Sequence, residues 1–475
     1  DEDFRATPDR RYVASALDQM NLSRLQLVLS HGLAVGDHLE LKTTFYRHDV
    51  SRAWAKVGKF SGGPSLSSIL ADPSSGQPQV YYRILKGQEE STTDVDQLML
   101  GTNARTFVAQ GVQTLSKLHF GGRERSLDIE AGLRLHYDEI LRDHSEVAMD
   151  MLEGQLADGG GDRVTNTLSL GSTFAIAGHL AAAVGFHGLT VTPGIRVESM
   201  KTRMDNQLTG TVAEAGETVP LFGVGLHYGF TDSLGVLAGV HQGFSPVAPG
   251  QPDEVASERS LSFELGARYG QPGPKTNVEL VGFYSDYSNI SGQCSFSAGC
   301  SEDQLDDQFN GGAATIYGVE FVAARTFDVT GSLKVPARLM YTFTHATFAN
   351  NFSSTNPQWG EVSIGDELPY VPTHQGSVQL GLESERWGLS TVATYLDEMR
   401  ESAGGAEGSD DSEEDLLTDR AVMIDAMGHW KIGEGTQLYL RVENVLNQRP
   451  IVSRRPYGAR PGKPLMAMTG LKVTF

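Results

Sequence analysis

The chain has 475 residues, with 38 Lys and Arg against 59 Asp and Glu, and therefore a formal net charge of −21. Two cysteines cannot staple a chain of this length, which excludes a disulfide-rich scaffold, and the negative charge disfavours binding to nucleic acid. No run of about 18 apolar residues is present, so a transmembrane helix is excluded, whereas a membrane-spanning β-barrel hides its apolar face in alternation.

Apolar and polar residues alternate along much of the chain with a period of two, which is the pattern of β-strands. The alternation is visible at 39–46 and becomes unbroken from Leu127, where every odd position up to Tyr137 is apolar. The even positions of the same stretch are charged, His or Gly. Further stretches of this kind follow in chain order at 222–230, 260–269, 333–343, 438–442 and 465–475.

About 17 such strands can be counted, and many are as long as a tilted strand must be to cross a bilayer. Strands of soluble proteins are shorter, with about 5–6 residues on average. Charged side chains on the inward face would be costly in a dry core but suit a water-filled lumen. The sequence therefore predicts an all-β fold, a transmembrane antiparallel β-barrel that occupies residues 1–475.

The predicted connections alternate between short and long. Short turns are expected at 34–38, 121–124, 231–233, 271–275, 328–332, 385–386 and 433–435. Long loops are expected at 58–106, 142–161, 202–218, 289–312, 349–373, 401–418 and 447–463. Short periplasmic turns and long outer loops are typical of outer-membrane barrels, so the long loops are assigned to the cell exterior.

The alternation also predicts how the first and last strands run. The last strand follows a long loop and runs from the outside to the periplasm, ending at Phe475. The first strand, near Leu25–Leu33, precedes a short turn and runs in the same direction. A bacterial barrel with an even number of strands should begin and end on the periplasmic side. We therefore expect N-terminal strands of the barrel to be missing from this chain.

Several short segments, in collinear order, resemble TonB-dependent outer-membrane receptors. The stretch 442–450 (VENVLNQRP) is similar to the penultimate-strand signature of that family, and 451–464 (IVSRRPYGARPGKP) narrows the resemblance to the branch of the ferric citrate receptor. Matches that are weak when taken singly extend the resemblance over the rest of the chain; they lie at 10–20, 44–54, 101–113, 243–266 and 317–320.

The resemblance implies a barrel of about 22 strands, an N-terminal plug folded inside it, and a TonB box before the plug. The plug, the box and about five strands are expected outside this chain, either in a longer protein or in a complementary N-terminal chain. The resemblance also implies location in the outer membrane of a Gram-negative bacterium. The implied function is uptake of ferric chelates, siderophores or iron citrate, with energy delivered through TonB acting on the plug.

Positive charge is concentrated in the segment 447–463, which contains basic residues and no acid. Guanidinium groups pair in bidentate fashion with carboxylates, so Arg454, Arg455 and Arg460 are candidates for contact with a negatively charged iron chelate. Arg105, at the outer end of a predicted strand, is a fourth candidate. The alternative for the basic residues of 447–463 is contact with lipid phosphates or with neighbouring acidic loops.

Cys294 and Cys300 lie close together in a predicted outer loop. In a protein that crosses an oxidising compartment, such a pair predicts a small disulfide ring. A two-thiolate metal site is the alternative, but no His is near enough in sequence to support it, and no cofactor is expected. The acidic run 407–415 lacks the ligand spacing of a calcium loop and is interpreted as a solvated loop or a contact to lipopolysaccharide through cations. His136 and His227 are expected to face the lumen.

The sequence has no His-Glu-x-x-His, no Gly-x-Ser-x-Gly and no phosphate-binding loop, so it does not predict an enzyme. Two alternatives to a receptor remain open. A passive porin of roughly 16–18 strands would conduct ions by itself, and a surface barrel for adhesion or phage docking would bind macromolecules through its long loops. For the receptor, the expected partners are the ferric chelate, TonB by way of the plug, outer-membrane lipid and lipopolysaccharide, and a complementary chain.

Overall fold

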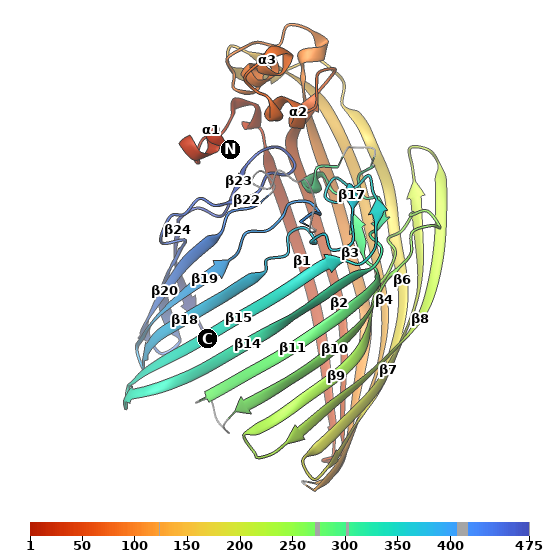
Figure 1. Ribbon diagram of the computed structural model, residues 1–475, viewed down its shortest axis with the longest axis vertical. Coiled ribbons are helices and arrows are strands. Elements are labelled where there is room, and N and C mark those ends of the chain that lie inside the picture. The colour runs from red at the N-terminus through yellow and green to blue at the C-terminus, as the bar shows by residue number, and fades with distance from the viewer. Residues whose placement is uncertain (123, 271–275, 301–303, 406–416, 475) are drawn as a thin grey trace.

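A computed structural model describes residues 1–475 apart from 123, 271–275, 301–303, 406–416 and 475. Its main feature is one curved antiparallel sheet in which consecutive long strands are hydrogen-bonded neighbours (Figure 1). Within the described residues the sheet has 18 strands, and one of them, β5 (Gln155–Asp158), has only four residues. The other strands match the predicted number, and the predicted fold class is confirmed.

The bounds of the elements show that most long strands exceed the length needed to cross a bilayer. The long strands are β1 (Gln19–Val35), β2 (Leu39–Phe60), β3 (Leu98–Gly121), β4 (Arg125–Leu152), β6 (Val164–Phe186), β7 (Leu189–Asn206), β8 (Thr211–Gly229), β9 (Leu234–Ser245), β10 (Glu258–Gly270), β11 (Thr276–Asn289), β14 (Ala314–Thr330), β15 (Leu333–Phe348), β18 (His374–Ser384), β19 (Trp387–Leu396), β20 (Ala421–Gly433), β21 (Thr436–Glu443) and β24 (Met466–Val473). Short elements occupy the connections: α1 (Glu2–Ala6), η1 (Val13–Ser15), α2 (Leu66–Ala71), α3 (Gly76–Leu85), η2 (Asp94–Asp96), β12 (Ser291–Gln293), η3 (Phe296–Ala298), β13 (Gln308–Asn310), β16 (Phe352–Ser353), β17 (Glu361–Val362), β22 (Ile451–Ser453) and β23 (Arg460–Pro461).

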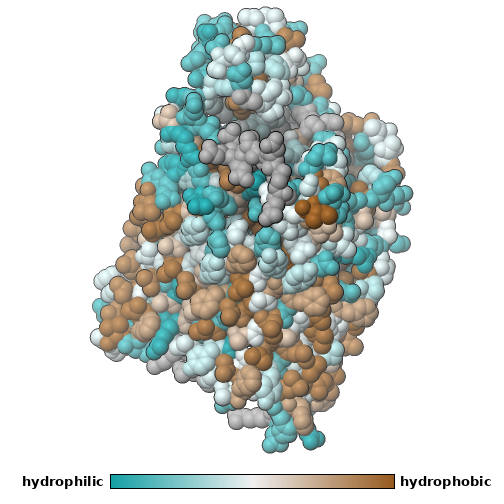
Figure 2. All heavy atoms as spheres, in the orientation of Figure 1, coloured by the Kyte–Doolittle hydropathy of each residue, from teal (hydrophilic) through white to brown (hydrophobic). Residues whose placement is uncertain are grey.

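The outward face of the sheet is apolar. On β10, alternate residues Leu261, Phe263 and Leu265 are large, apolar and exposed, and Leu265 is 68% exposed. Figure 2 shows hydrophobic side chains gathered over the strands, while hydrophilic side chains dominate the end that carries the helices. Exposed apolar surface of this extent is stable in lipid and not in water. Among the described residues, no helix has the length and apolar character required to cross a bilayer.

Two of the predicted long loops are largely strand. The segment 142–161 continues β4 to Leu152, and 202–218 is a paired extension of β7 and β8 that turns only between Asn206 and Thr211. The loop prediction is wrong there because both strand pairs continue beyond the lipid. The β7–β8 extension is mostly exposed, whereas the outer part of β4 is covered, and Glu146 and Met151 on it are buried. Without lipid on one face, apolar and polar residues no longer alternate there, although the backbone hydrogen bonds continue.

The connection between β2 and β3 forms a small cap above the sheet, at the top of Figure 1. It contains α2 and α3, whose apolar side chains pack on the outer ends of β2, β3 and β4. Ile69 and Ile84 are almost fully buried, with exposed fractions of 0% and 1%, and they belong to one cluster with Leu98 and Met151. The cap therefore has a hydrophobic core of its own outside the lipid-facing surface.

Among the described residues, β1 pairs with β2 and β24 pairs with β21, and no pairing joins β1 to β24. The sheet thus has two edges. At the outer end, the segment 1–18 lies against the loops of the C-terminal strands through three ion pairs. These pairs join Arg5 to Asp419 (2.6 Å), Arg449 to Asp9 (3.0 Å) and Arg454 to Asp1 (2.8 Å).

Candidate ligand-binding site at the outer mouth

Three arginines lie side by side across adjacent strands. Arg52 on β2 is opposite Arg105 on β3, and Arg105 is opposite Arg142 on β4. We call these three residues the arginine ladder. Directly opposite residues have Cβ atoms about 4.5–5.5 Å apart, and like charges at that spacing destabilise a sheet. The ladder therefore requires an anion.

Asp306, from the connection between β11 and β14, supplies that anion. Arg105 donates from Nη1 to Oδ1 (3.1 Å) and from Nη2 to Oδ2 (3.0 Å), which is a bidentate pair. Arg142 Nε lies 3.2 Å from the same Oδ2. The side chains of Arg105, Arg142 and Asp306 are only 15%, 11% and 12% exposed, so solvent screens this cluster weakly.

Arg52 is the third member of the ladder. Its Nε is buried and has no hydrogen-bond partner among the described residues. The four side chains carry three positive charges and one negative charge, so the cluster has an excess of two positive charges. A buried donor without an acceptor is costly to maintain, and it favours the arrival of further acceptor oxygens.

A cavity of about 650 Å³ adjoins the arginine ladder. Arg105 Nε donates to Asn103 Oδ1 (2.9 Å) and to His144 Nε2 (3.3 Å), and both of these residues line the cavity. The strand wall also carries Lys56, whose Nζ lies 4.0 Å from the centre of the Trp54 ring. The loop side of the cavity is formed by Leu66, Cys300, Leu305 and Tyr457.

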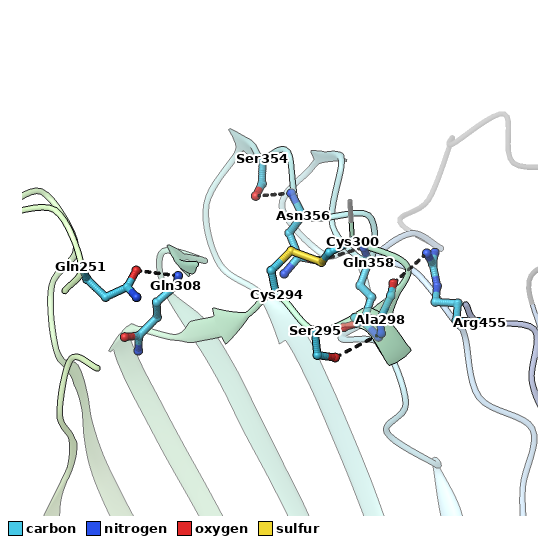
Figure 3. The surroundings of a disulfide bond; sticks show 10 residues. All are labelled: Gln251, Cys294, Ser295, Ala298, Cys300, Gln308, Ser354, Asn356, Gln358 and Arg455. Carbon is cyan, nitrogen blue, oxygen red and sulfur yellow. Dashed lines mark hydrogen bonds between the residues drawn. A yellow bond between two sulfur atoms is a disulfide. The ribbon is translucent and has the colours of Figure 1, made fainter. Parts of the chain in front are cut away.

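Cys294 and Cys300 form a disulfide in the structure, with Cα atoms 5.8 Å apart, and both cysteines are buried (Figure 3). The disulfide, Ala298 and Leu305 pack together in one small apolar cluster. Because Cys300 and Leu305 line the cavity, this loop is part of the site. The acidic run 407–415 lies outside the described residues.

The predicted arginines of the segment 447–463 lie near this site but in different environments. Arg455 Nη1 donates to the carbonyl oxygen of Ala298 in the disulfide loop (3.3 Å), as Figure 3 shows. Arg460 Nη1 donates to the carbonyl oxygen of Arg455 (3.2 Å). Arg454 is engaged elsewhere, by the buried Glu401 (2.8 Å) and by Asp1. Of the four arginines chosen from the sequence, only Arg105 belongs to the ladder.

Arg52, Arg142 and Asp306 were not predicted. Arg142 is the first residue of an expected long loop and Arg52 lies outside the expected loops, and only strand register reveals that both face Arg105. Asp306 is separated from Arg105 by 201 positions, and no local pattern marks it. The lumen-facing prediction is compatible with His136, which contacts Tyr46 (2.6 Å) and Asp138 (3.2 Å) in a polar network.

A family model described as "TonB dependent receptor-like, beta-barrel" matches residues 3–445. The chain belongs to this family. Its members are outer-membrane proteins of Gram-negative bacteria and are transporters rather than enzymes, so the predicted family and location are confirmed.

Several solved structures share the fold. The ferric citrate transporter FecA in its unliganded form has a TM-score of 0.69 at 17% identity, over 99% of this chain and 64% of that chain. The ferric-catecholate import receptor Fiu from E. coli K12 has a TM-score of 0.67 at 13% identity, and the match covers 98% of this chain and 66% of that chain. The siderophore receptor PiuA from Acinetobacter baumannii has a TM-score of 0.70 at 11% identity, and the match covers 96% of this chain and 65% of that chain. The chain therefore spans less than two thirds of the length of these proteins.

Proposed function

We propose that this chain is the barrel wall of an outer-membrane receptor that captures a negatively charged, citrate-like ferric chelate and imports it with energy from TonB. The observation that carries this proposal is the arginine ladder beside the outer cavity. Three guanidinium groups facing one carboxylate favour a ligand that brings further carboxylate oxygens.

The choice of an anionic chelate depends on the ladder and not on the fold. The structures described above are named for ferric citrate, for ferric catecholates and for siderophores, and all share this fold at 17% identity or less. The net charge of −21 does not oppose the proposal. Acids more than about 8–10 Å away are largely screened at physiological ionic strength, so the local positive charge dominates at the site.

The predicted arginines of the segment 447–463 have separate roles in this proposal. Arg455 and Arg460 supply positive charge beside the disulfide loop, next to Tyr457 on the cavity wall. Arg454 holds the segment in place through Glu401 and is not assigned to the ligand. Outer-membrane lipid and lipopolysaccharide are proposed to contact the apolar face and the outer loops.

Energy coupling is proposed to involve a plug domain outside this chain. The two edge strands, β1 and β24, are the first and last members of an antiparallel series with an odd number of long strands, so they run in the same direction. An antiparallel closure of the barrel therefore needs an odd number of additional strands, and about five would complete a barrel of about 22. We propose that these strands and the plug belong to a longer protein or to a complementary chain.

Mass spectrometry of the native outer-membrane protein tests this completion. We expect peptides from a plug and additional strands either in the same polypeptide as residues 1–475 or in a second chain that co-purifies with it. A native protein whose mass corresponds to these residues alone, with no companion, would contradict the proposal.

The ligand proposal is tested by Arg105→Gln, with ferric citrate binding measured by calorimetry on the purified receptor. Hydrogen bonds to charged groups contribute about 1.5–3 kcal/mol, so we expect affinity to fall by about ten- to a hundredfold. Arg163→Gln is the matched control, because Arg163 is an exposed arginine that pairs with Asp143. Equal affinities of the Arg105 variant and the wild type would remove the ladder from the site.

A further inference from the structure

We propose that Asp306 is a built-in competitor of the ligand. Its carboxylate occupies the arginine ladder in place of a ligand carboxylate, so that the site admits only ligands whose own anionic oxygens replace it. This inference rests on the proposed function and adds to it a residue that determines specificity.

The contacts of Asp306 are those expected of a ligand carboxylate. Both of its oxygens accept from Arg105, and one of them also lies 3.2 Å from Arg142 Nε. Asp306 reaches these arginines from a loop and not from a neighbouring strand. The hydrogen bonds between Arg105 and Asp306 are therefore not part of the backbone pairing of the sheet. Replacement of the Asp306 carboxylate by a ligand carboxylate leaves the strands paired.

The loop holds the backbone of Asp306 in an unusual conformation. Its φ is +75°, in the left-handed region that residues other than Gly seldom adopt and that Asp and Asn tolerate best. The Asp306 N–H donates to the carbonyl of Cys294 (2.9 Å), and the Cys294 N–H donates to the carbonyl of Asp307 (2.7 Å). Gln251 Nε2 donates to the carbonyl of Asp306 (3.0 Å). These bonds fix the carboxylate toward the ladder.

The disulfide connects Asp306 to the cavity wall. Cys294 binds the backbone of Asp306 and Asp307, and its disulfide partner Cys300 lines the cavity together with Leu305. From the opposite side, Arg455 donates to Ala298 within the ring (Figure 3). A ligand that enters the cavity therefore meets the loop that carries the competing carboxylate.

The chemistry of the exchange defines the class of ligand. When Asp306 leaves, two N–H groups of Arg105 lose their acceptors and Arg142 loses its ion-pair partner, and an uncompensated buried charge is strongly destabilising. A chelate with free carboxylate oxygens refills these positions. A neutral chelate brings no such oxygens and does not replace the Asp306 carboxylate. The ligand class is therefore a carboxylate-bearing anion, with or without bound iron.

The test is Asp306→Asn in the full-length receptor, with Asp253→Asn as a control that removes one charge from an exposed acid of another outer loop. Asn keeps the size of the side chain and tolerates the positive φ. Calorimetry measures the affinity for citrate, for ferric citrate and for a neutral ferric hydroxamate. We expect Asp306→Asn to bind both citrate probes about tenfold more tightly than the wild type and the control, as removal of one charged competitor predicts, with no gain for the neutral chelate.

Citrate affinity of Asp306→Asn that does not exceed that of the wild type and the control overturns the inference. If the wild type fails to bind ferric citrate while Asp306→Asn gains affinity for citrate, the proposed function fails and the competitor role stands. The double variant Cys294→Ala/Cys300→Ala provides a second test that leaves the Asp306 carboxylate intact but releases its backbone. We expect the double variant to gain less citrate affinity than Asp306→Asn does. If Asp306→Asn does not fold, a double variant without any gain in citrate affinity overturns the inference.

Discussion

At the scale of single residues, charge pairs in the outer loops hold the segment 1–18 in place. Asp419 accepts two hydrogen bonds from Arg5 and one from the N–H of Ile451 (2.7 Å). Hydrogen bonds from the Arg5 guanidinium hold the pKa of Asp419 below its usual range. Tyr82 and Tyr12 likewise lower the pKa of Asp3 by donating to its carboxylate. Partly exposed ion pairs each contribute about 0–1 kcal/mol, so the segment depends on several of them.

The first prediction is that this segment detaches in acid. A carboxyl whose folded-state pKa is depressed stabilises the folded form above its unfolded pKa, about 3.9 for Asp, and that contribution is lost as the pH falls through the folded value. A spin label on Ala6→Cys is expected to become mobile below about pH 4. The variant Asp419→Asn should show raised mobility already at pH 7. A label whose mobility does not rise as the pH is lowered from about 4 to about 1 would contradict this.

At the scale of elements, α2 and α3 show that an outer loop of a membrane barrel can have its own core. Ile84 on α3 is 1% exposed and packs with Ile69 and Leu98, whereas Val80 on the same helix is 48% exposed. Ile84→Ala is expected to cost the cap about 2–5 kcal/mol, because the site cannot close over the cavity it leaves. Val80→Ala should change stability by about 0.5 kcal/mol or less.

Hydrogen exchange of residues 61–97 measures this difference locally. We expect faster exchange in the cap of Ile84→Ala, while β10 and β14, which have no residue in the cap cluster, keep their protection. Equal protection of the cap in the two alanine variants would show that α3 does not depend on this core.

At the scale of the whole molecule, the lipid-facing surface decides where the protein is stable. Leu265 on β10 is 68% exposed on the apolar face, and its neighbour Glu264 points to the other face of the same strand. Leu265→Arg should destabilise the folded receptor in bilayers by about 2–4 kcal/mol if the site lies near the midplane. Glu264→Arg, facing water, should not have this cost. Urea unfolding in liposomes compares the two, and equal stabilities would contradict the assignment of faces.

The sequence by itself determined the strand pattern, the apolar face and the family, because alternation and turn residues are local and are set by the solvent on each side of a strand. It failed at 142–161 and 202–218, where strands extend beyond the lipid and apolar and polar residues no longer alternate. It identified Arg105 as a candidate for ligand contact but did not show that Arg105 lies between Arg52 and Arg142.

The tertiary structure alone decided the site. Arg52, Arg105 and Arg142 become a ladder only through the register of three strands, and a shift of one residue would turn a side chain to the other face. Asp306 reaches Arg105 from the loop after β11, which is the seventh long strand beyond β3 in the sheet. Such contacts depend on loop closure over long separations, which no local pattern of residues encodes.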